Sequence, residues 1–435
     1  MLLASREVWS ASVDHSMNNG PNIGVALPDP VPFAVAVAVL GLVVIAVLAA
    51  GRICTRTGIP LPVVVLACAA IAARLLPGAA HLGEVPVSRI VTVALVLVLF
   101  AGGMHIGRRR TLRSIRPVVA LGVVGTVVTA GSAGVFAHFA LGLSWYPALL
   151  VATALAPTDP TVVFALLGKY PVPGTVTTVL EGESGANDPV GIALMAALLD
   201  AKGISLSGLG HAGTAFALQM LLGCLIGLAG GRVLLWLLRS ASLGGAGQQS
   251  IVSLSAAIAI FGLAAAAGGS GFLAVFLAGI MLGDEPFAHK AEVEHFHATL
   301  AGLGEIAAFV SLGITVNLTV VSEVSTWVPG LALAAIVTLV ARPLAAAGCL
   351  VGSGLSLPEK LFVAFAGLKG AVPILLGTYL LGAATGENER LYGIVVVVVV
   401  VSVSVQGTLL RPASARLVSG RGLRRAKPRS TPEAR

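Results

Sequence analysis

Long apolar runs, separated by short polar or charged segments, fill the chain from residue 31 to residue 410. A helix that crosses the hydrocarbon core of a bilayer needs about 20 apolar residues. The pattern therefore predicts thirteen membrane-spanning helices, at residues 31–50, 60–76, 89–106, 117–140, 147–168, 179–199, 213–238, 250–267, 270–283, 300–320, 328–351, 358–383 and 391–410. Because the runs are continuous, the alternating pattern of an outer-membrane barrel is excluded.

The composition indicates an all-α polytopic membrane protein. Hydrophobic residues make up 57% of the 435 residues and charged residues only 11%, against roughly 25% charged residues in an ordinary soluble domain. This balance excludes the soluble globular and the disordered classes of protein. The four cysteines are dispersed and form no zinc or disulfide pattern. We therefore expect no resident metal or cofactor.

The net charge of +8 is distributed unevenly along the chain. If the C-terminus is cytoplasmic, the inner loops hold eleven basic residues, the outer side holds five, and the tail adds eight more. Since cytoplasmic loops carry the excess of Lys and Arg, we predict a multi-pass plasma-membrane protein with its N-terminus outside. Residues 1–30 are then an extracytoplasmic segment, and residues 412–435 are a basic cytoplasmic tail that membrane lipid attracts. No nucleic-acid partner is indicated.

Apart from Arg74, Arg89, Glu359 and Lys360 at the ends of predicted spans, eight charged residues fall inside them: Asp159, Glu181, Glu183, Asp188, Arg232, Glu305, Arg342 and Lys369. A charge at the bilayer centre costs at least about 2.5–3.5 kcal/mol, so such residues usually line a transport pathway or pair with one another. Glu181 and Arg232 lie near span ends, where a long side chain can reach water. The sequence does not decide whether Glu305 faces a site or a helix interface. Most of the others lie beside prolines and glycines.

Two prolines interrupt the predicted span 147–168, in the segment Ala156-Pro157-Thr158-Asp159-Pro160-Thr161. Proline has no N–H group, so these two leave the carbonyl oxygens of Thr153 and Ala156 without their helical donors. Freed carbonyl oxygens, together with Asp159, are suitable ligands for a small cation. A purely structural kink capped by Asp159 is the alternative.

A second polar segment lies in predicted span 179–199: Glu181-Gly182-Glu183-Ser184-Gly185-Ala186-Asn187-Asp188-Pro189. On a helix, Glu183 and Asn187 share one strip of the surface, and Ser184 and Asp188 share the adjacent strip. One acid can therefore serve an ion cavity while the other pairs with a neighbouring helix. Oxygen ligands of these kinds suit an alkali cation or a proton rather than a transition metal. A polar seam for helix packing is the alternative.

The third interruption is Gly367-Leu368-Lys369-Gly370-Ala371-Val372-Pro373, in predicted span 358–383. It lies seven spans after the first, which fits two inverted six-helix repeats, about 31–200 and 250–411, with a connector helix at about 213–238. Interrupted segments at corresponding positions of two repeats are typical of a transporter's binding site. Arg342 is then a partner for Glu183, with Lys369 as the alternative, because an unpaired buried charge is costly.

Taken in order, the Thr-Asp-Pro, Glu-Ser-Gly-Ala-Asn-Asp-Pro, Ala-Arg-Pro and Gly-Leu-Lys-Gly-Ala-Val-Pro segments resemble the monovalent cation:proton antiporter-1 family, of the NhaP type. The Asn-Asp-Pro form and the segment Phe100-Ala101-Gly102-Gly103-Met104 resemble its bacterial potassium/proton branch. The resemblance covers residues 31–411. It implies a homodimer of exchanger domains, each with two inverted six-helix repeats, crossing broken helices and an elevator-like movement.

The resemblance also implies roles for individual residues. Those expected to bind the cation and the proton are Asp188, Asn187, Ser184, Thr158 (through its backbone carbonyl) and the nearby Asp159. Glu183 is expected to form a core ion pair with Arg342. Two residues depart from the family pattern, since Lys369 stands where Arg is frequent and Ala101 stands where an acid is frequent.

The sequence therefore predicts an antiporter, and not an enzyme, that exchanges Na⁺ or K⁺ for H⁺ at Asp188. Either ion neutralises the same carboxylate, so the two exclude each other and the exchange is electroneutral. A cation channel or uniporter is the first alternative, although a channel needs a continuous selectivity filter. The second is an intramembrane serine protease, since Ser184 and Ser270 lie in loose Gly-x-Ser-Gly patterns. A protease needs a general base, and the histidines at 211, 289, 295 and 297 fall in predicted loops.

The predicted loop 284–297, which holds three of these histidines, is either a solvated segment or a pH sensor.

Overall fold

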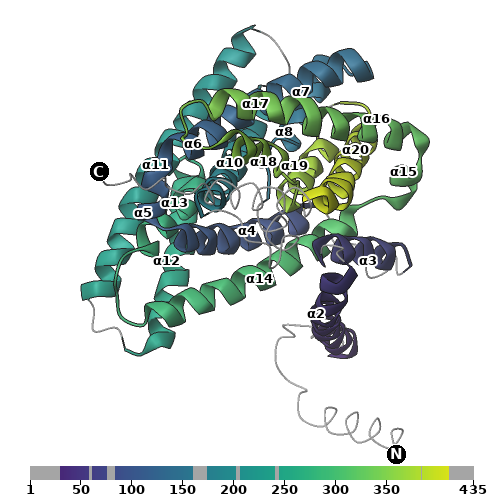
Figure 1. Cartoon of the computed structure of the whole chain (residues 1–435). Helices are drawn as coiled ribbons and strands as arrows, with labels where there is room; N and C mark the ends of the chain where they lie inside the picture. The colour runs from purple at the N-terminus through teal and green to yellow at the C-terminus, as the bar shows by residue number, and fades with distance from the viewer. Residues whose placement is uncertain are drawn as a thin grey trace, which may run out of the picture. The chain divides into compact units, whose positions relative to one another are not determined.

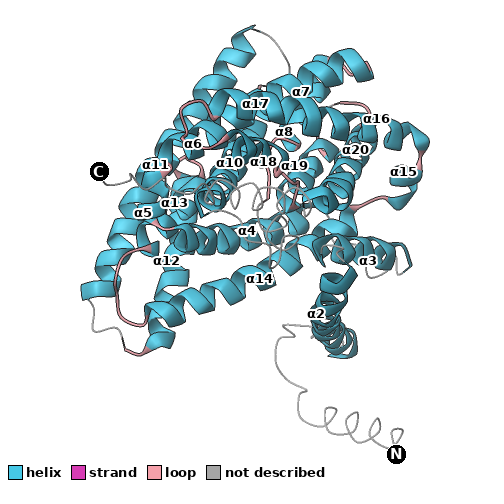
Figure 2. Cartoon of the chain, in the orientation of Figure 1, coloured by secondary structure: helices cyan, strands magenta, loops and turns pink. Residues whose placement is uncertain are grey.

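The structure is a computed structural model of the chain, and it describes residues 30–57, 61–75, 84–159, 174–201, 206–240, 244–383 and 385–410. Within these residues every regular element is a helix and no strand occurs (Figure 2). The predicted all-α class is therefore confirmed. The predicted extracytoplasmic segment, up to residue 29, and the predicted basic tail, 412–435, lie outside the described residues.

The helices follow one another with short connections. In the first part of the chain they are α2 (Pro30–Thr57), α3 (Leu61–Leu75), α4 (Glu84–Ile106), α5 (Arg108–Arg113), α6 (Ile115–Val119), the π-helical η1 (Ala120–Gly125), α7 (Thr126–Leu141), α8 (Trp145–Ala154), α10 (Gly174–Asp200) and α11 (Leu206–Ser240). In the second part they are α12 (Ala246–Ala266), α13 (Gly271–Gly283), α14 (Lys290–Thr315), α15 (Leu318–Ser322), α16 (Val324–Ile336), the π-helical η2 (Val337–Ala341), α17 (Arg342–Cys349), α18 (Leu357–Phe365), α19 (Ala371–Leu381), α20 (Asn388–Val401) and the π-helical η3 (Ser402–Gln406).

Seven stretches of the described chain are long and apolar enough to cross a membrane, and several shorter apolar helices accompany them. Helix α10 is long enough, but its acidic residues make it too polar to count among the seven. The polytopic α-helical architecture agrees with the sequence prediction, while the number of thirteen spans and the division into two repeats stay predictions.

Residues 1–49 and residues 50–435 form two compact units, and the packing described here lies within the second. One group of its helices is built around α4, with α13 and α14 packed against it (Figure 1). Helices α4 and α13 approach closely because Gly103 and Gly279 face each other's backbone, where a Cβ atom on either would overlap the partner helix. Helix α11 packs on α13, α12 packs on α13 and α14, and α3 packs on α14. We call these helices the α4 group.

A second group of helices packs around the two interrupted spans. It contains α7 on α8, α16 and α19 on α20, α10 against η1, α6 and α8, and α17 against η1, α7 and α18. We call these helices the α10 group. Helix α8 ends at Ala154, and the chain then runs without helix as far as Asp159. A similar stretch, from Gly367 to Gly370, separates α18 from α19. Both predicted interruptions are therefore present, and residues 160–168 of the first span lie outside the described residues.

The start of α14 differs from the prediction. The predicted span begins at residue 300 and its preceding loop carries the histidines, whereas the helix begins at Lys290. His295 and His297 are therefore helical, and so is His211, which lies in α11. For the start of α14 the physical reason is the burial of His297, which is only 1% exposed. It packs edge-on against Phe100 of α4 and contacts Ser253 of α12 at 2.7 Å. Predicting these residues as a loop was wrong.

Candidate ion-binding site

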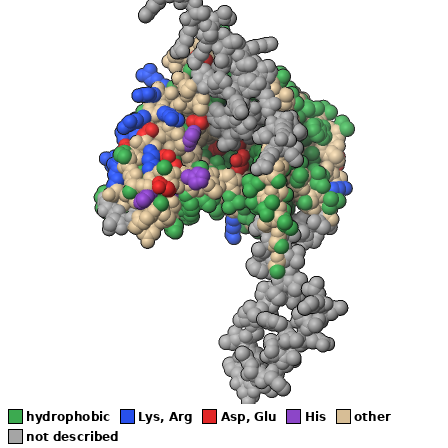
Figure 3. Space-filling model, turned by 60° about the horizontal axis from the view of Figure 1, so that its bottom comes forward, with side chains coloured by type: hydrophobic (Ala, Val, Ile, Leu, Met, Phe, Trp, Pro, Cys, Tyr) green, Lys and Arg blue, Asp and Glu red, His purple; other side chains and the backbone are tan. Residues whose placement is uncertain are grey.

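A cavity of about 600 Å³ lies between the α4 group and the α10 group. Its wall on the α4 group comes from α4, from Phe276 of α13 and from α14. Its wall on the α10 group comes from Thr158 and Asp159, from α10 and from the first turn of α19. Figure 3 shows acidic and histidine side chains in the middle of one face of the molecule and basic side chains gathered along one side of it. Most of the predicted ion-binding residues therefore share one cavity.

Helix α10 carries Ser184 and Asp188 to the cavity, one turn apart on the same face. Asp188 is partly exposed to the cavity and forms no hydrogen bond or ion pair with any residue that the structure describes. Ser184 Oγ donates a hydrogen bond of 2.5 Å to the backbone oxygen of Thr158. The carboxylate of Asp188 is thus left available to a ligand from the cavity.

Asn187 lies behind the cavity wall and does not line it. Its Nδ2 donates a hydrogen bond of 2.7 Å to Thr158 Oγ1, while its Oδ1 is buried and has no hydrogen-bond partner within the described chain. Asn187 and Ser184 therefore both hold Thr158 in place. The other predicted ligands line the cavity, while Asn187 supports Thr158 from behind the wall.

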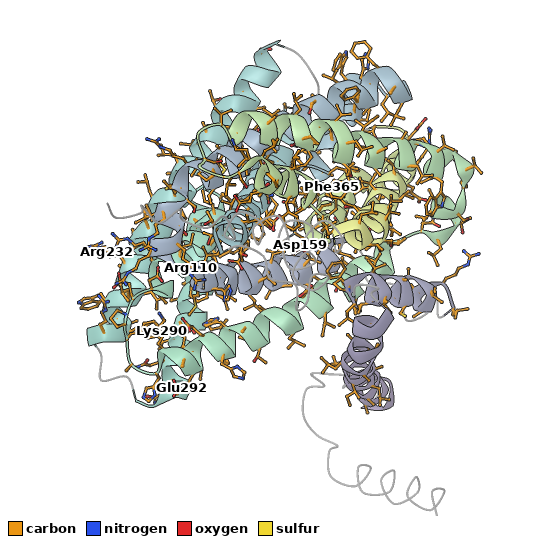
Figure 4. All side chains as sticks on the ribbon, in the orientation of Figure 1. Arg110, Asp159, Arg232, Lys290, Glu292 and Phe365 are labelled. Carbon is orange, nitrogen blue, oxygen red and sulfur yellow. The ribbon has the colours of Figure 1, made fainter. Side chains whose placement is uncertain are left out.

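Asp159 lies at the centre of the helices (Figure 4) and lines the same cavity. Its backbone N–H donates a hydrogen bond of 2.8 Å to the carbonyl oxygen of Leu368, so the two interruptions cross here. The Asp159 carboxylate lies against Gly370, where any Cβ atom would overlap it. The close approach of the two interruptions therefore depends on a residue without a side chain.

Lys369 forms hydrogen bonds with carbonyl oxygens of the first interruption. Its Nζ donates hydrogen bonds of 3.3 Å to the oxygen of Ala156 and 3.1 Å to that of Pro157, and the side chain is fully buried. The oxygen of Thr153 accepts from the backbone N–H of Ala156 at 3.2 Å. The sequence predicted that the Thr153 and Ala156 carbonyls are free for a cation, and this is wrong because an ammonium and a backbone N–H already bind them.

Glu183 and Arg342 form a bidentate ion pair between α10 and the start of α17. Arg342 Nη2 donates to Glu183 Oε2 at 2.8 Å, and Arg342 Nη1 contacts Glu183 Oε1. The two side chains are only 1% and 3% exposed. Arg342, and not the alternative Lys369, is thus the partner of Glu183. The two acids of α10 are separated in space, since Glu183 is tied within the α10 group while Asp188 faces the cavity.

Sequence reasoning left three cavity residues unassigned: His105, Glu181 and Glu305. His105 Nε2 lies 3.7 Å from Glu181 Oε1 at an exposed end of the cavity, where the two side chains are 73% and 14% exposed. Glu305 lines the cavity from α14, although the sequence left its direction open. A helical series of small residues before Glu305, namely Ala298, Ala301 and Gly302, could have indicated that this face borders open space.

The cavity is chemically suited to small cations. Its lining contains four carboxylates, Asp159, Glu181, Asp188 and Glu305, while His105 is the one basic side chain among the described lining residues. Carboxylate and hydroxyl oxygens are hard ligands that prefer alkali and alkaline-earth cations. Within the described residues no three His, Cys, Asp or Glu side chains are close enough together to hold a metal ion. The lining therefore suits an alkali cation bound by oxygen atoms.

Comparison with known proteins gives a family and a fold. A sequence model described as "Sodium/hydrogen exchanger, transmembrane" matches residues 42–416. The chain is 32% identical over 365 residues to the K(+)/H(+) antiporter NhaP2 of Shewanella oneidensis, which covers 83% of this chain and 63% of that protein. It is 28% identical over 308 residues to Na(+)/H(+) antiporter 1 of Methanocaldococcus jannaschii, which covers 65% of this chain and 68% of that protein. The chain thus spans about 63% of the length of the Shewanella relative.

The solved structure of the sodium proton antiporter MjNhaP1 from Methanocaldococcus jannaschii at pH 8 superposes on this structure with a TM-score of 0.75. The match covers 89% of this chain and 99% of that chain at 20% sequence identity. At this identity the likeness shows a shared fold.

Proposed function

The chain belongs to the sodium/hydrogen exchanger family, and we propose on that basis that it exchanges a monovalent cation, Na⁺ or K⁺, for H⁺ across the membrane. The observation that supports this most directly is the position of Asp188, a carboxylate on the wall of an acidic cavity with no ion-pair partner among the described residues. A free carboxylate at membrane depth is costly unless it carries a proton or a cation. Asp188 is therefore occupied by one ion or the other in turn.

Competition at one carboxylate accounts for exchange. A proton and an alkali cation each neutralise Asp188, so the site holds one positive charge at a time. The neutralised site crosses a low-dielectric region at less cost than a bare carboxylate. Because each direction of transport moves one charge, the exchange is electroneutral. Ser184 and Asn187 hold Thr158, whose backbone oxygen and hydroxyl lie next to the carboxylate-bearing helix.

Alternating access follows from the division into two helix groups. Asp188 and Asp159 belong to the α10 group, whereas α4 and α14 supply the opposite wall. Movement of the α10 group past the α4 group carries the neutralised site from one side of the membrane to the other. The Glu183–Arg342 pair and the contacts of Lys369 lie within the α10 group, so they keep it rigid during this movement.

We assign the basic end of the molecule to the cytoplasm. Arg110, Arg232 and Lys290 lie at the same end (Figure 4), and Lys and Arg are enriched in cytoplasmic loops. His105 lines the cavity beside this end and is well exposed, so the cavity opens toward the cytoplasm. The proposal includes the predicted orientation, with the N-terminus outside and the C-terminus inside, in the plasma membrane, and the predicted homodimer.

Reconstitution into liposomes tests the function. Wild-type protein is expected to dissipate an imposed pH gradient when Na⁺ or K⁺ is added, and the rate should not change when the membrane potential is held at zero. Comparison of Na⁺, K⁺ and Li⁺ then identifies the preferred cation. Proton-independent cation currents would instead indicate a channel or uniporter.

A further inference from the structure

Glu305 is a carboxylate of the cavity that the exchange cycle at Asp188 does not use. It lies on α14, in the wall that the α4 group supplies. The side chain is half-buried and forms no hydrogen bond or ion pair with any other described residue. An unpaired carboxylate within a membrane span is costly, so Glu305 needs a ligand from the cavity.

The space around Glu305 can hold such a ligand. On α14 the neighbouring lining residues are Ala298, Ala301 and Gly302, and on α4 they include Ala101 and Gly102. These side chains are too small to fill the cavity, which has a volume of about 600 Å³. The acidic lining concentrates cations there, because a cleft with one sign of charge and low-dielectric walls focuses its field.

Glu305 and Asp188 belong to different walls of the cavity, since Glu305 lies on α14 and Asp188 lies on α10. No three acidic or histidine side chains of the described chain converge closely enough to bind one ion. Asp159 lines the same cavity from the side of the α10 group. The cavity therefore offers two carboxylate positions on different walls, Glu305 on the α4 group and Asp188, together with Asp159, on the α10 group.

We propose that Glu305 is a first binding position for the monovalent cation in the open cavity, which holds the ion before it passes to Asp188. The inference rests on the proposed exchange function and adds a residue that sets cation affinity. Since Glu305 belongs to the α4 group, it does not travel with Asp188. It therefore governs how readily the cavity-facing state takes up the cation, and not the maximal rate of exchange.

The test compares cation dependence in proteoliposomes of Glu305→Gln, Glu305→Asp and the matched control Glu292→Gln. Glu292 lies on the same helix at its exposed end, away from the cavity and from Asp159 (Figure 4). Glu305→Gln is expected to raise the half-saturating Na⁺ or K⁺ concentration on the cavity side about tenfold, the order expected for one lost charge interaction in a partly solvated site. The maximal rate should stay within about twofold. Glu305→Asp should fall between wild type and Glu305→Gln, and Glu292→Gln should match wild type.

The outcomes separate this proposal from the proposed function. Exchange by the wild type with an unchanged half-saturating concentration in Glu305→Gln overturns the role of Glu305 and leaves the antiporter assignment standing. If the wild type exchanges no cation, thermal unfolding of the purified proteins in Na⁺ or K⁺ tests whether Glu305 binds the cation. A cation-induced rise in Tm that Glu305→Gln lacks supports the binding position, whereas an equal rise in both proteins, or none in either, overturns it. If Glu305→Gln does not fold, Glu305→Asp takes its place in both measurements. The proposal is then overturned if Glu305→Asp has the same half-saturating concentration, or the same cation-induced rise in Tm, as Glu292→Gln.

Discussion

The backbone N–H of Asp159 donates a hydrogen bond of 2.8 Å to the carbonyl oxygen of Leu368. This bond joins the non-helical stretches of two spans that lie far apart in the sequence. Backbone groups that leave a helix inside a membrane need partners, because no water is available in the hydrocarbon core. The bond supplies one such partner and fixes the carboxylate of Asp159 at the wall of the cavity.

Gly370→Ala is expected to impair transport by displacing Asp159. The new methyl group would overlap the Asp159 carboxylate, so the two interruptions would move apart. Displacement of a positioned group by about 1 Å can lower a rate about a hundredfold. We expect a smaller effect here, a loss of exchange of at least about tenfold. Gly262→Ala on α12 is the matched control, because nothing lies within 4 Å of its Cβ position. Equal exchange rates for the two variants would show that the approach at Gly370 is not required.

Glu183→Gln should destabilise the protein by about 3–5 kcal/mol, because it leaves the buried guanidinium of Arg342 without its counter-charge. Arg342→Met should do the same to Glu183. The double variant should cost less than the two single variants together, since it removes both buried charges. Unfolding midpoints of the four purified proteins in one detergent measure this, and additive losses would argue against a direct coupling between the two residues.

The proposed orientation predicts which membrane-impermeant reagents reach the cavity. In a background without the four native cysteines, Ala298→Cys should react with a charged thiol reagent added from the cytoplasmic side. It should be protected from the same reagent added outside. Leu331→Cys on the surface of α16 is the control, because that residue is exposed outside the cavity and should face lipid. Labelling of Ala298→Cys from the outside alone would reverse the assigned topology.

Competition at Asp188 predicts a definite pH dependence. When protons occupy most of the sites, each lowering of the pH by one unit should raise the half-saturating cation concentration about tenfold. The maximal rate at saturating cation should change little, because the cation displaces the proton. Initial rates across a series of pH values on the cavity side measure both quantities. A half-saturating concentration that is independent of pH would indicate separate sites for the two ions.

Much of the fold could be predicted from the sequence because apolar runs and helix breakers act locally. The interruptions follow from Pro157 and from the glycines around Lys369, since these residues alter their own helices whatever surrounds them. The spacing of Ser184 and Asp188 likewise fixes that they share one face of α10. The predicted start of α14 was wrong because the first turns of this helix are amphipathic. Their charged residues made the segment look like a loop, whereas His297 on their apolar face packs against Phe100.

Contacts between distant segments could not be predicted in the same way. The sequence shows that Pro157 and Pro160 cannot donate backbone hydrogen bonds, but it does not show that Lys369 reaches two carbonyls of that segment. It offered both Arg342 and Lys369 as partners of Glu183. The direction of Glu305 was open for a similar reason, since helical periodicity gives a face and only the packing of α14 on α4 decides that this face borders the cavity.

The central claim is that Asp188 carries the cation and the proton in turn, and Asp188→Asn tests it most directly. The asparagine keeps the size of the side chain and removes the charge that either ion neutralises. Cation-driven dissipation of a pH gradient should fall to the level of empty liposomes, while the variant inserts and unfolds at a temperature close to that of the wild type. Exchange by Asp188→Asn at the wild-type rate would contradict the account.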